Sequence, residues 1–293
     1  MLRVYPMKAE IDFARHVLTL CGVPEHEMQQ LHVLVAAAAA RSDDPSVVSH
    51  VCSRSLPPGS IHKLAAGVYM SGPELCFLQM GEVFNDTREL VEFGYELCGS
   101  YEMGFDTDDD YRERAALCGL ESIESVLDAF PGARGVGAAR RAMRYVREGS
   151  RSPMETAHIM TLVLPRRMGG SGIRGVTMNY RVDVPPQLRH LARQGFAVLD
   201  GCIPGHLLDL EYNGFHHDED ARRARDEERR NVLEAMGYRV KVLTRFAFFD
   251  GRGYRRHLRS IFRILGIRED RLPAGFWGKQ EELRRFVLRR WLV

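Results

Sequence analysis

Residues 198–244 read VLDGCIPGHLLDLEYNGFHHDEDARRARDEERRNVLEAMGYRVKVLT, and the expected α/β class follows from their pattern. Two apolar runs, residues 196–199 and 206–212, flank Gly and Pro residues at 201–204, which is typical of two paired, half-buried strands. A charged helix is expected over about residues 218–236, where Gly237 would end it. Residues 238–244 alternate like a strand, so this segment predicts the order β-β-α-β.

Two acids, Asp200 and Glu211, belong to the two expected strands. In an antiparallel pair, side chains at such positions can face one point in space. Converging carboxylates repel each other unless a positive charge lies between them, and Mg²⁺ or Mn²⁺ prefers such all-oxygen ligands. A bound divalent ion can activate water and stabilise the charge that develops on a phosphate. The residues alone leave a second interpretation open, in which both acids are solvated turn residues.

The order of short motifs resembles the core of the small PD-(D/E)XK nucleases related to very-short-patch-repair endonucleases. The resemblance covers roughly residues 149–266. The motifs that carry it are Ser152-Pro153-x-Glu155-Thr156, Asp200-x-x-x-Pro204, Glu211-Tyr212-x-Gly214-x-x-His217, the helix through Arg229 and Arg230, and Gly237-Tyr238-Arg239-Val240 with Thr244.

This resemblance implies a restriction-endonuclease-like three-layer α/β/α domain with a mixed central sheet. It implies that Asp200, Glu211 and Glu155 hold Mg²⁺ or Mn²⁺ during hydrolysis of DNA. His217 matches the family histidine, which acts as a general base, a general acid or a phosphate contact. The motif lysine of the family falls at Asn213, and Lys241 on the next strand is our candidate to replace its charge.

Several of these residues also have purely structural interpretations. Glu155 follows Ser152 at the spacing of a capping box, so it could simply cap its helix. The run ARRARDEERR at residues 221–230 is typical of a solvated helix face. The resemblance places one or two of its arginines at the site entrance as phosphate contacts, and Arg223 and Arg230 are our candidates. His217 could be a turn residue that bonds to the backbone.

The N-terminal part of the chain is expected to form a separate α/β domain, residues 1–148. Its segment His50-Val51-Cys52-Ser53-Arg54 and the following LPPGSIHKL and GVYMSGPE resemble a domain of AbiEi-type antitoxins over about residues 50–100. The nuclease-like domain is expected over residues 149–270, and residues 271–293 are expected to be a helical tail. That tail could dock on the nuclease domain or on another subunit.

Composition narrows the classes of function. The chain has 293 residues, 45% hydrophobic and 27% charged, with a formal net charge of only +2, so any nucleic-acid surface must come from local arginine clustering. No apolar run is long enough to span a bilayer, and six scattered cysteines without a C-x-x-C motif indicate a cytoplasmic protein with reduced thiols. Two functions remain: a metal-dependent endonuclease of a defence, repair or mobile-element system, or a non-catalytic DNA-binding or antitoxin-like regulator on the same scaffold.

Overall fold

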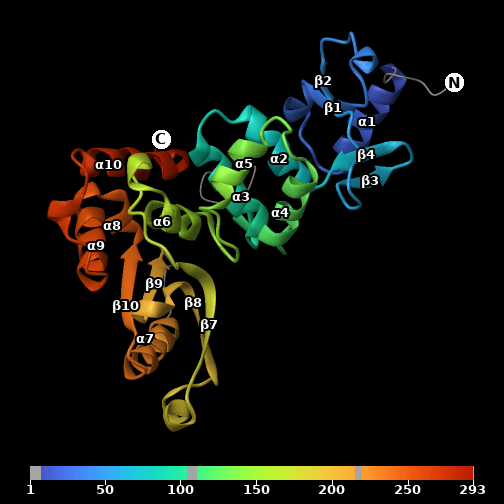
Figure 1. The fold of residues 1–293 in the computed structure, drawn as a ribbon. Helices are drawn as coiled ribbons and strands as arrows, with labels where there is room; N and C mark the ends of the chain where they lie inside the picture. The colour runs from blue at the N-terminus through green and yellow to red at the C-terminus, as the bar shows by residue number, and fades with distance from the viewer. Residues whose placement is uncertain (1–7, 104–110, 215–219, 293) are drawn as a thin grey trace. The chain divides into compact units, whose positions relative to one another are not determined.

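The structure is a computed structural model that describes residues 8–103, 111–214 and 220–292. Its contacts separate the chain into two units, one up to Cys76 and the other from Phe77 onward. Helices and strands alternate through the chain (Figure 1), so the expected α/β class is confirmed. The boundaries expected near residues 148 and 270 remain predictions.

The described part of the first unit contains the helix α1 (Lys8–Leu20), short 3-10 helices and two small sheets. Helix α1 buries Ile11 and Val17, as its apolar spacing predicts. Strands β1 (Leu31–Val35) and β2 (Val47–Val51) pair in parallel, and β3 (Ile61–Ala65) and β4 (Val68–Ser71) form an antiparallel hairpin. The polyalanine segment at residues 36–40 contains a short 3-10 helix, Ala38–Ala40.

Helices make up the first part of the second unit. They are α2 (Pro73–Val83, which begins in the first unit), α3 (Thr87–Cys98), α4 (Leu120–Ala129) and α5 (Val136–Met143). A small antiparallel pair, β5 (Tyr101–Met103) and β6 (Tyr111–Glu113), follows α3. The hydroxyl of buried Tyr101 shares a 2.9 Å hydrogen bond with Oγ1 of Thr156. This bond connects the β5–β6 pair to the helix that contains Thr156.

A four-stranded mixed sheet follows, in the order β10-β9-β8-β7 (Figure 1). Its strands are β7 (Thr177–Asp183), β8 (Phe196–Ile203), β9 (Leu208–Asn213) and β10 (Arg239–Thr244). Strands β7 and β9 each pair with β8 in an antiparallel manner. Strands β9 and β10 pair in parallel and are joined through α7 (Asp220–Ala235). Gly237 adopts a left-handed backbone (φ 85°) just after this helix. The predicted β-β-α-β order is therefore confirmed.

The turn between β8 and β9 lies later than the sequence indicates. Gly201 and Cys202 continue β8, and the chain turns at Pro204–His206 and Leu207, whose φ is 46°. A glycine fits position 201 because little space is left there for a side chain. A Cβ at Gly201 would lie 2.9 Å from Cδ1 of Ile159, so this position lets a helix pack closely on the strand.

We therefore expect Gly201→Ala to destabilise the protein by about 1–2 kcal/mol through overpacking. The added methyl group would also approach Cβ of Leu210 at 3.3 Å, so Ile159 cannot relieve the crowding alone. Urea unfolding measures the change. Gly195→Ala is the matched control, because nothing lies within 4 Å of a Cβ there, and its free energy of unfolding should stay equal or rise slightly. Equal effects at both positions would contradict the close-packing explanation.

The remaining helices are α6 (Pro153–Val163), α8 (Arg245–Phe249), α9 (Gly251–Ile264) and α10 (Phe276–Val287). Helix α6 is buried on nearly every side and contacts β8, β9 and α10, which makes it the central helix of this unit. Figure 1 shows α8 and α9 beside β10. None of the helices in the described ranges is both long enough and apolar enough to cross a bilayer.

Candidate functional site

Asp200 and Glu211 lie opposite each other on neighbouring strands. The register of β8 and β9 pairs Gly201 with Leu210, and Asp200 and Glu211 are the residues next to this last pair on the two strands. After burial, the charge of Glu211 is the main cause that raises the pKa of Asp200, so the two carboxylates lie within electrostatic reach of each other. Asp200 Oδ2 also accepts a 3.2 Å hydrogen bond from the backbone N–H of Tyr212. The structure thus brings these two sequence-predicted residues together.

A third carboxylate, Asp209, belongs to the same face but was not among the sequence candidates. It lies two residues before Glu211 on β9, and alternate residues of a strand share a face. Its side chain is fully buried, and among the described residues no N–H or hydroxyl group donates to either carboxylate oxygen, although a hydrogen bond shared with the carboxyl group of Glu211 contributes to its raised pKa. The signal that could have found it is the period of two in Asp209-Leu210-Glu211, which the apolar run concealed.

Burial and mutual repulsion raise the pKa values of Asp200 and Asp209, so both carboxylates hold protons more strongly than exposed ones do. Burial, and then the charge of Glu211, raises the pKa of Asp200 to about 6. The same two causes in the same order raise the pKa of Asp209 to about 9. Displaced pKa values from burial and like charges are typical of functional sites, although buried structural networks show them too. The positively charged groups around the cluster therefore do not fully compensate its negative charge.

Part of that compensation comes from Arg229 on α7, which the sequence analysis did not single out for the site. One guanidinium nitrogen of Arg229 ion-pairs with Oε2 of Glu211, and the other donates a 3.1 Å hydrogen bond to the carbonyl of Val198. Among the described residues, no N–H or hydroxyl group donates to Oε1 of Glu211. Helical spacing alone could not distinguish Arg229 from the other arginines of α7, because only the packing of that helix selects it.

Glu155 makes the capping contact that its sequence context suggested, whereas its role as a metal ligand remains a prediction. Its Oε2 accepts a 2.9 Å hydrogen bond from the N–H of Arg151, and its Oε1 accepts a 3.0 Å bond from the hydroxyl of Ser152. Ser152 in turn accepts the N–H of Glu155 at 3.2 Å, so the capping contact is present. Burial, and then the charge of Asp200, raises the pKa of Glu155 to about 7. The Glu155 carboxylate therefore caps α6, and the charge of Asp200 acts on it.

Lys241 is not brought to the carboxylates. The parallel register of β9 and β10 pairs Val240 with Asp209 and Val242 with Glu211, whereas Lys241 pairs with Leu210 on the other face. The charge of Lys241 acts instead on His257 of α9, whose pKa is lowered to about 4 by burial and then by this lysine. A replacement for the motif lysine therefore has to come from elsewhere.

The remaining candidates are placed only in part. Arg230 lies on α7 with an exposed side chain, and the structure puts no carboxylate within ion-pair distance of it among the described residues. His217 and the side chain of Arg223 lie outside the described part of the chain. Their expected roles remain predictions.

Asn179 on β7 flanks the site with a strained backbone. It falls between the pairs Met178–Gly201 and Tyr180–Leu199, and therefore lies opposite Asp200. Its φ is 46°, a left-handed value that asparagine tolerates better than most residues. Its Nδ2 donates a 2.6 Å hydrogen bond to the carbonyl of Gly149. This bond anchors the strand next to Asp200 to the segment that leads into α6.

The donor set is chemically suited to a hard divalent cation. Oxygen atoms of Asp200, Asp209 and Glu211 lie within electrostatic reach of one another, since the charge of Glu211 acts on both aspartates, and Asp209 and Glu211 share one face of β9. However, within residues 8–103, 111–214 and 220–292, no three His, Cys, Asp or Glu side chains are already arranged as a metal-binding group. The ion pair of Arg229 with Glu211 is the visible obstacle, because it occupies one of the oxygens that a cation would need.

Asp209→Asn should make the protein more stable at alkaline pH. Because the pKa of Asp209 is raised to about 9 in the folded state, that state retains a proton that the unfolded chain has lost above about pH 4. The free energy of unfolding therefore falls as pH rises through this window, by at most about 1.4 kcal/mol per pH unit. Between pH 7 and 8.5 the free energy of unfolding of the wild type should therefore fall by about 2 kcal/mol because of Asp209. Asp209→Asn should not show this fall, because its amide does not titrate.

Urea unfolding at several pH values measures the difference. The window above pH 7 is chosen because the pKa values of Asp200 and Glu155, about 6 and about 7, lie at or below it. Asp183→Asn on β7 is the control, since that exposed carboxylate pairs only with Arg181 at the surface. A pH dependence that is identical in the wild type and in Asp209→Asn would show that Asp209 does not hold this proton.

Comparisons with known protein families, with curated proteins and with solved structures found no match to this chain. The resemblance to PD-(D/E)XK nucleases thus rests on the quoted motifs and remains a prediction.

Proposed function

We propose that the second unit is a metal-dependent endonuclease that hydrolyses phosphodiester bonds of DNA, in a defence, repair or mobile-element context. The observation that carries the proposal is the cluster of Asp200, Asp209 and Glu211 on the adjacent strands β8 and β9, in which no N–H or hydroxyl group of the described residues donates to Asp209 or to Oε1 of Glu211 and the pKa of Asp200 is raised. Asp200 and Glu211, with Glu155 or Asp209 as a further ligand, would hold Mg²⁺ or Mn²⁺. When bound, such an ion supplies an activated water and stabilises charge on the phosphate.

The protein's own residues prepare this site in three ways. The N–H of Tyr212 fixes the orientation of Asp200, and the hydroxyl of Ser152 fixes that of Glu155. Arg229 holds Glu211 by an ion pair, and its guanidinium could turn to a non-bridging phosphate oxygen once Glu211 binds a cation. In this proposal Arg229 takes the electrostatic role for which sequence suggested Lys241.

A second candidate is a non-catalytic DNA-binding or antitoxin-like regulator that retains the nuclease scaffold. The contact between Arg229 and Glu211 favours it, because a permanent ion pair would neutralise the site without a metal. Asn213 in place of the motif lysine favours it as well. The two candidates therefore differ in whether Arg229 is a temporary or a permanent partner of Glu211.

The experiment that tests the proposal is incubation of supercoiled plasmid with the protein and Mg²⁺ or Mn²⁺. Nicking that EDTA prevents supports the endonuclease. Inertness of well-folded protein with both ions, over a range of plasmid sequences, would refute it and leave the regulator.

We also propose a cytoplasmic location with DNA as the partner. All six cysteines are free thiols, and Cys98 and Cys202 are buried. Unpaired thiols fit a reducing compartment. Alkylation of protein taken directly from cells would test this, because disulfide-linked cysteines would escape modification.

A further inference from the structure

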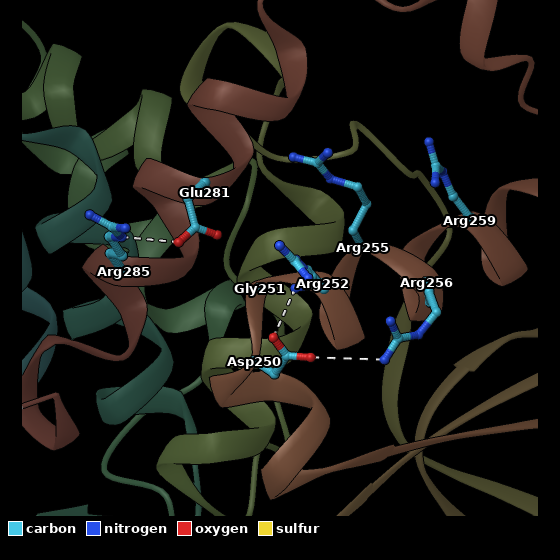
Figure 2. Close-up of a pocket in the computed structure, with 8 residues that line it drawn as sticks. All are labelled: Asp250, Gly251, Arg252, Arg255, Arg256, Arg259, Glu281 and Arg285. Atoms are coloured by element: carbon cyan, nitrogen blue, oxygen red, sulfur yellow. Dashed lines mark hydrogen bonds and ion pairs between the residues drawn. The ribbon is translucent and has the colours of Figure 1, made fainter.

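An arginine-rich pocket of about 710 Å³ lies between α9 and α10, apart from the carboxylates described above (Figure 2). Five guanidinium groups and two carboxylates line it, so its formal charge is +3. The lining residues are Asp250, Gly251, Arg252, Arg255, Arg256, Arg259, Glu281 and Arg285. A chain with a net charge of only +2 therefore concentrates positive charge at one place.

The helical period explains how the arginines gather. Helix α9 buries Tyr254, Leu258, Ile261 and Phe262 on one side. Arginines at positions 252, 255, 256 and 259 consequently fall together on the exposed side. From the first to the last of them the helix advances seven residues, or about 10 Å. Figure 2 shows this row of guanidinium groups along α9, with Arg285 contributed by α10.

The two acids of the lining are already engaged: Asp250 pairs with Arg256 at 3.8 Å and Glu281 with Arg285 at 3.0 Å, and other groups donate to both acids. Asp250 caps α9 and accepts the N–H groups of Arg252 and Gly253 at 3.2 and 2.8 Å. Glu281 accepts two bonds, of 2.9 and 2.7 Å, from Arg284, which is buried and does not line the pocket. The hydrogen bonds from Gly253 and from Arg284 respectively are the main causes that lower the pKa of Asp250 and of Glu281. Both acids are therefore ionised at neutral pH.

Two of the arginines keep their full capacity for an external anion. Within the described ranges, no carboxylate lies within 4.0 Å of the guanidinium of Arg252 or Arg255. Arg255 lies over the ring of Trp277 at 4.9 Å, and Arg259 lies over the same ring at 5.5 Å. Stacking restricts these side chains in advance, so they lose less conformational entropy when they bind.

The walls of the pocket are held rigidly. Arg284 donates to the carbonyls of Phe248 and Phe249 at 2.9 and 3.0 Å, which fixes α10 against the end of α8. Gly251 begins α9 so close to α10 that a Cβ there would lie 3.0 Å from Oε2 of Glu281. The arginines of α9 and of α10 therefore keep a fixed separation, as a preformed binding site requires.

We propose that this pocket binds consecutive phosphates of a nucleic-acid strand. Guanidinium groups bind phosphate oxygens in a bidentate manner, and the pocket offers several of them in a row. The row of about 10 Å extends over about three steps of 3.4 Å along a nucleic-acid helix axis, so it can contact more than one consecutive phosphate of a strand. That the strand is DNA rests on the proposed function, whereas binding by this pocket requires no cleavage.

The test compares two charge-matched double variants of the full chain. Arg252→Gln with Arg255→Gln removes the two unpaired guanidinium groups of the pocket. Arg263→Gln with Arg271→Gln removes two exposed arginines that do not line it, one of them on the same helix. Binding of a fluorescent 30-nucleotide single strand is measured by anisotropy in EDTA at several KCl concentrations, so that cleavage plays no part.

We expect the wild-type affinity to fall with rising salt, and the pocket variant to show a slope that is shallower by about 1.4, since each single-strand phosphate contributes about 0.7. If binding at 1 M KCl is equal, that change in slope is a loss of about 25-fold at 0.1 M KCl. The control variant should keep the wild-type slope. Equal losses in both variants, or an unchanged slope in the pocket variant, would overturn the proposal.

Competition separates a strand from a compact anion. Inorganic tripolyphosphate at the same phosphate concentration should displace the labelled strand less effectively than unlabelled strand does. Equal displacement would overturn the strand in favour of a small polyphosphate ligand. Failure of the wild-type protein to cleave plasmid, together with normal binding of the strand, refutes the proposed nuclease alone. Normal cleavage by the wild type, together with unchanged strand binding by the pocket variant, refutes this inference alone.

Discussion

Asp200→Ala is expected to abolish Mg²⁺- or Mn²⁺-dependent nicking of plasmid DNA. The substitution removes the carboxylate that faces Glu211 across the strands and that influences Glu155 electrostatically. A bound metal contributes several kcal/mol of transition-state stabilisation. A loss of about 4 kcal/mol corresponds to a rate lower by about 10³-fold. The rate of conversion of supercoiled into nicked plasmid, at saturating metal, measures the effect.

The matched control is Asp183→Ala at the far end of β7, an exposed aspartate of the same sheet that pairs with Arg181. It should keep the wild-type rate, because an exposed ion pair contributes little to stability. Thermal unfolding of both variants shows that they are folded. Asp200→Ala relieves like-charge repulsion, so it should be at least as stable as wild type without metal. Residual nicking equal to wild type would refute the assigned role of Asp200.

Local patterns were sufficient to predict the secondary structure around the site. The alternation at residues 238–244 became β10, the charged run became α7, and Gly237 ended that helix as expected. These features depend on backbone geometry and on burial of one face, which a single segment encodes by itself. The partnership of Asp200 with Glu211 was also accessible, because a tight antiparallel connection leaves few registers.

Features that depend on packing between segments could not be predicted in this way. Gly201 looks like a turn residue in sequence, yet it extends β8 because Ile159 of a distant helix needs the space. Lys241 and Arg229 are both basic residues near the acids in sequence. The sheet register turns Lys241 away, whereas the packing of α7 brings Arg229 to Glu211. The same tertiary information places Arg285 of α10 beside the arginines of α9.

Arg229→Gln is expected to destabilise the protein in the absence of divalent ions. It leaves Glu211 beside Asp200 and Asp209 with no positive partner within ion-pair distance in the described structure. Loss of one partner from a fully buried ion pair costs about 3–5 kcal/mol. Here the side chain of Glu211 is 12% exposed and that of Arg229 is 33% exposed, so we expect about 2–3 kcal/mol. For a unit of this size the melting temperature would fall by roughly 5–10 °C.

Arg193→Gln is the matched control, because Arg193 pairs with Glu228 of the same helix at 2.8 Å but its side chain is 66% exposed. Its cost should stay within about 1 kcal/mol. If Arg229→Gln is no less stable than this control, the ion pair does not neutralise the site, and the argument for a permanent counter-ion fails.

Divalent ions then separate the two candidate functions. If the carboxylates form a metal site, Mn²⁺ replaces the missing charge, and at about 100 times its dissociation constant it restores about 2.7 kcal/mol to Arg229→Gln. The double variant Arg229→Gln, Asp200→Ala should gain nothing, because the ligand that faces Glu211 is gone. Mn²⁺ should also stabilise Arg229→Gln more than wild type, in which the guanidinium competes for Glu211. If Mn²⁺ leaves the melting temperature of Arg229→Gln unchanged, the cluster is not a metal site. Arg229 would then be a permanent structural partner of Glu211, as the regulator requires.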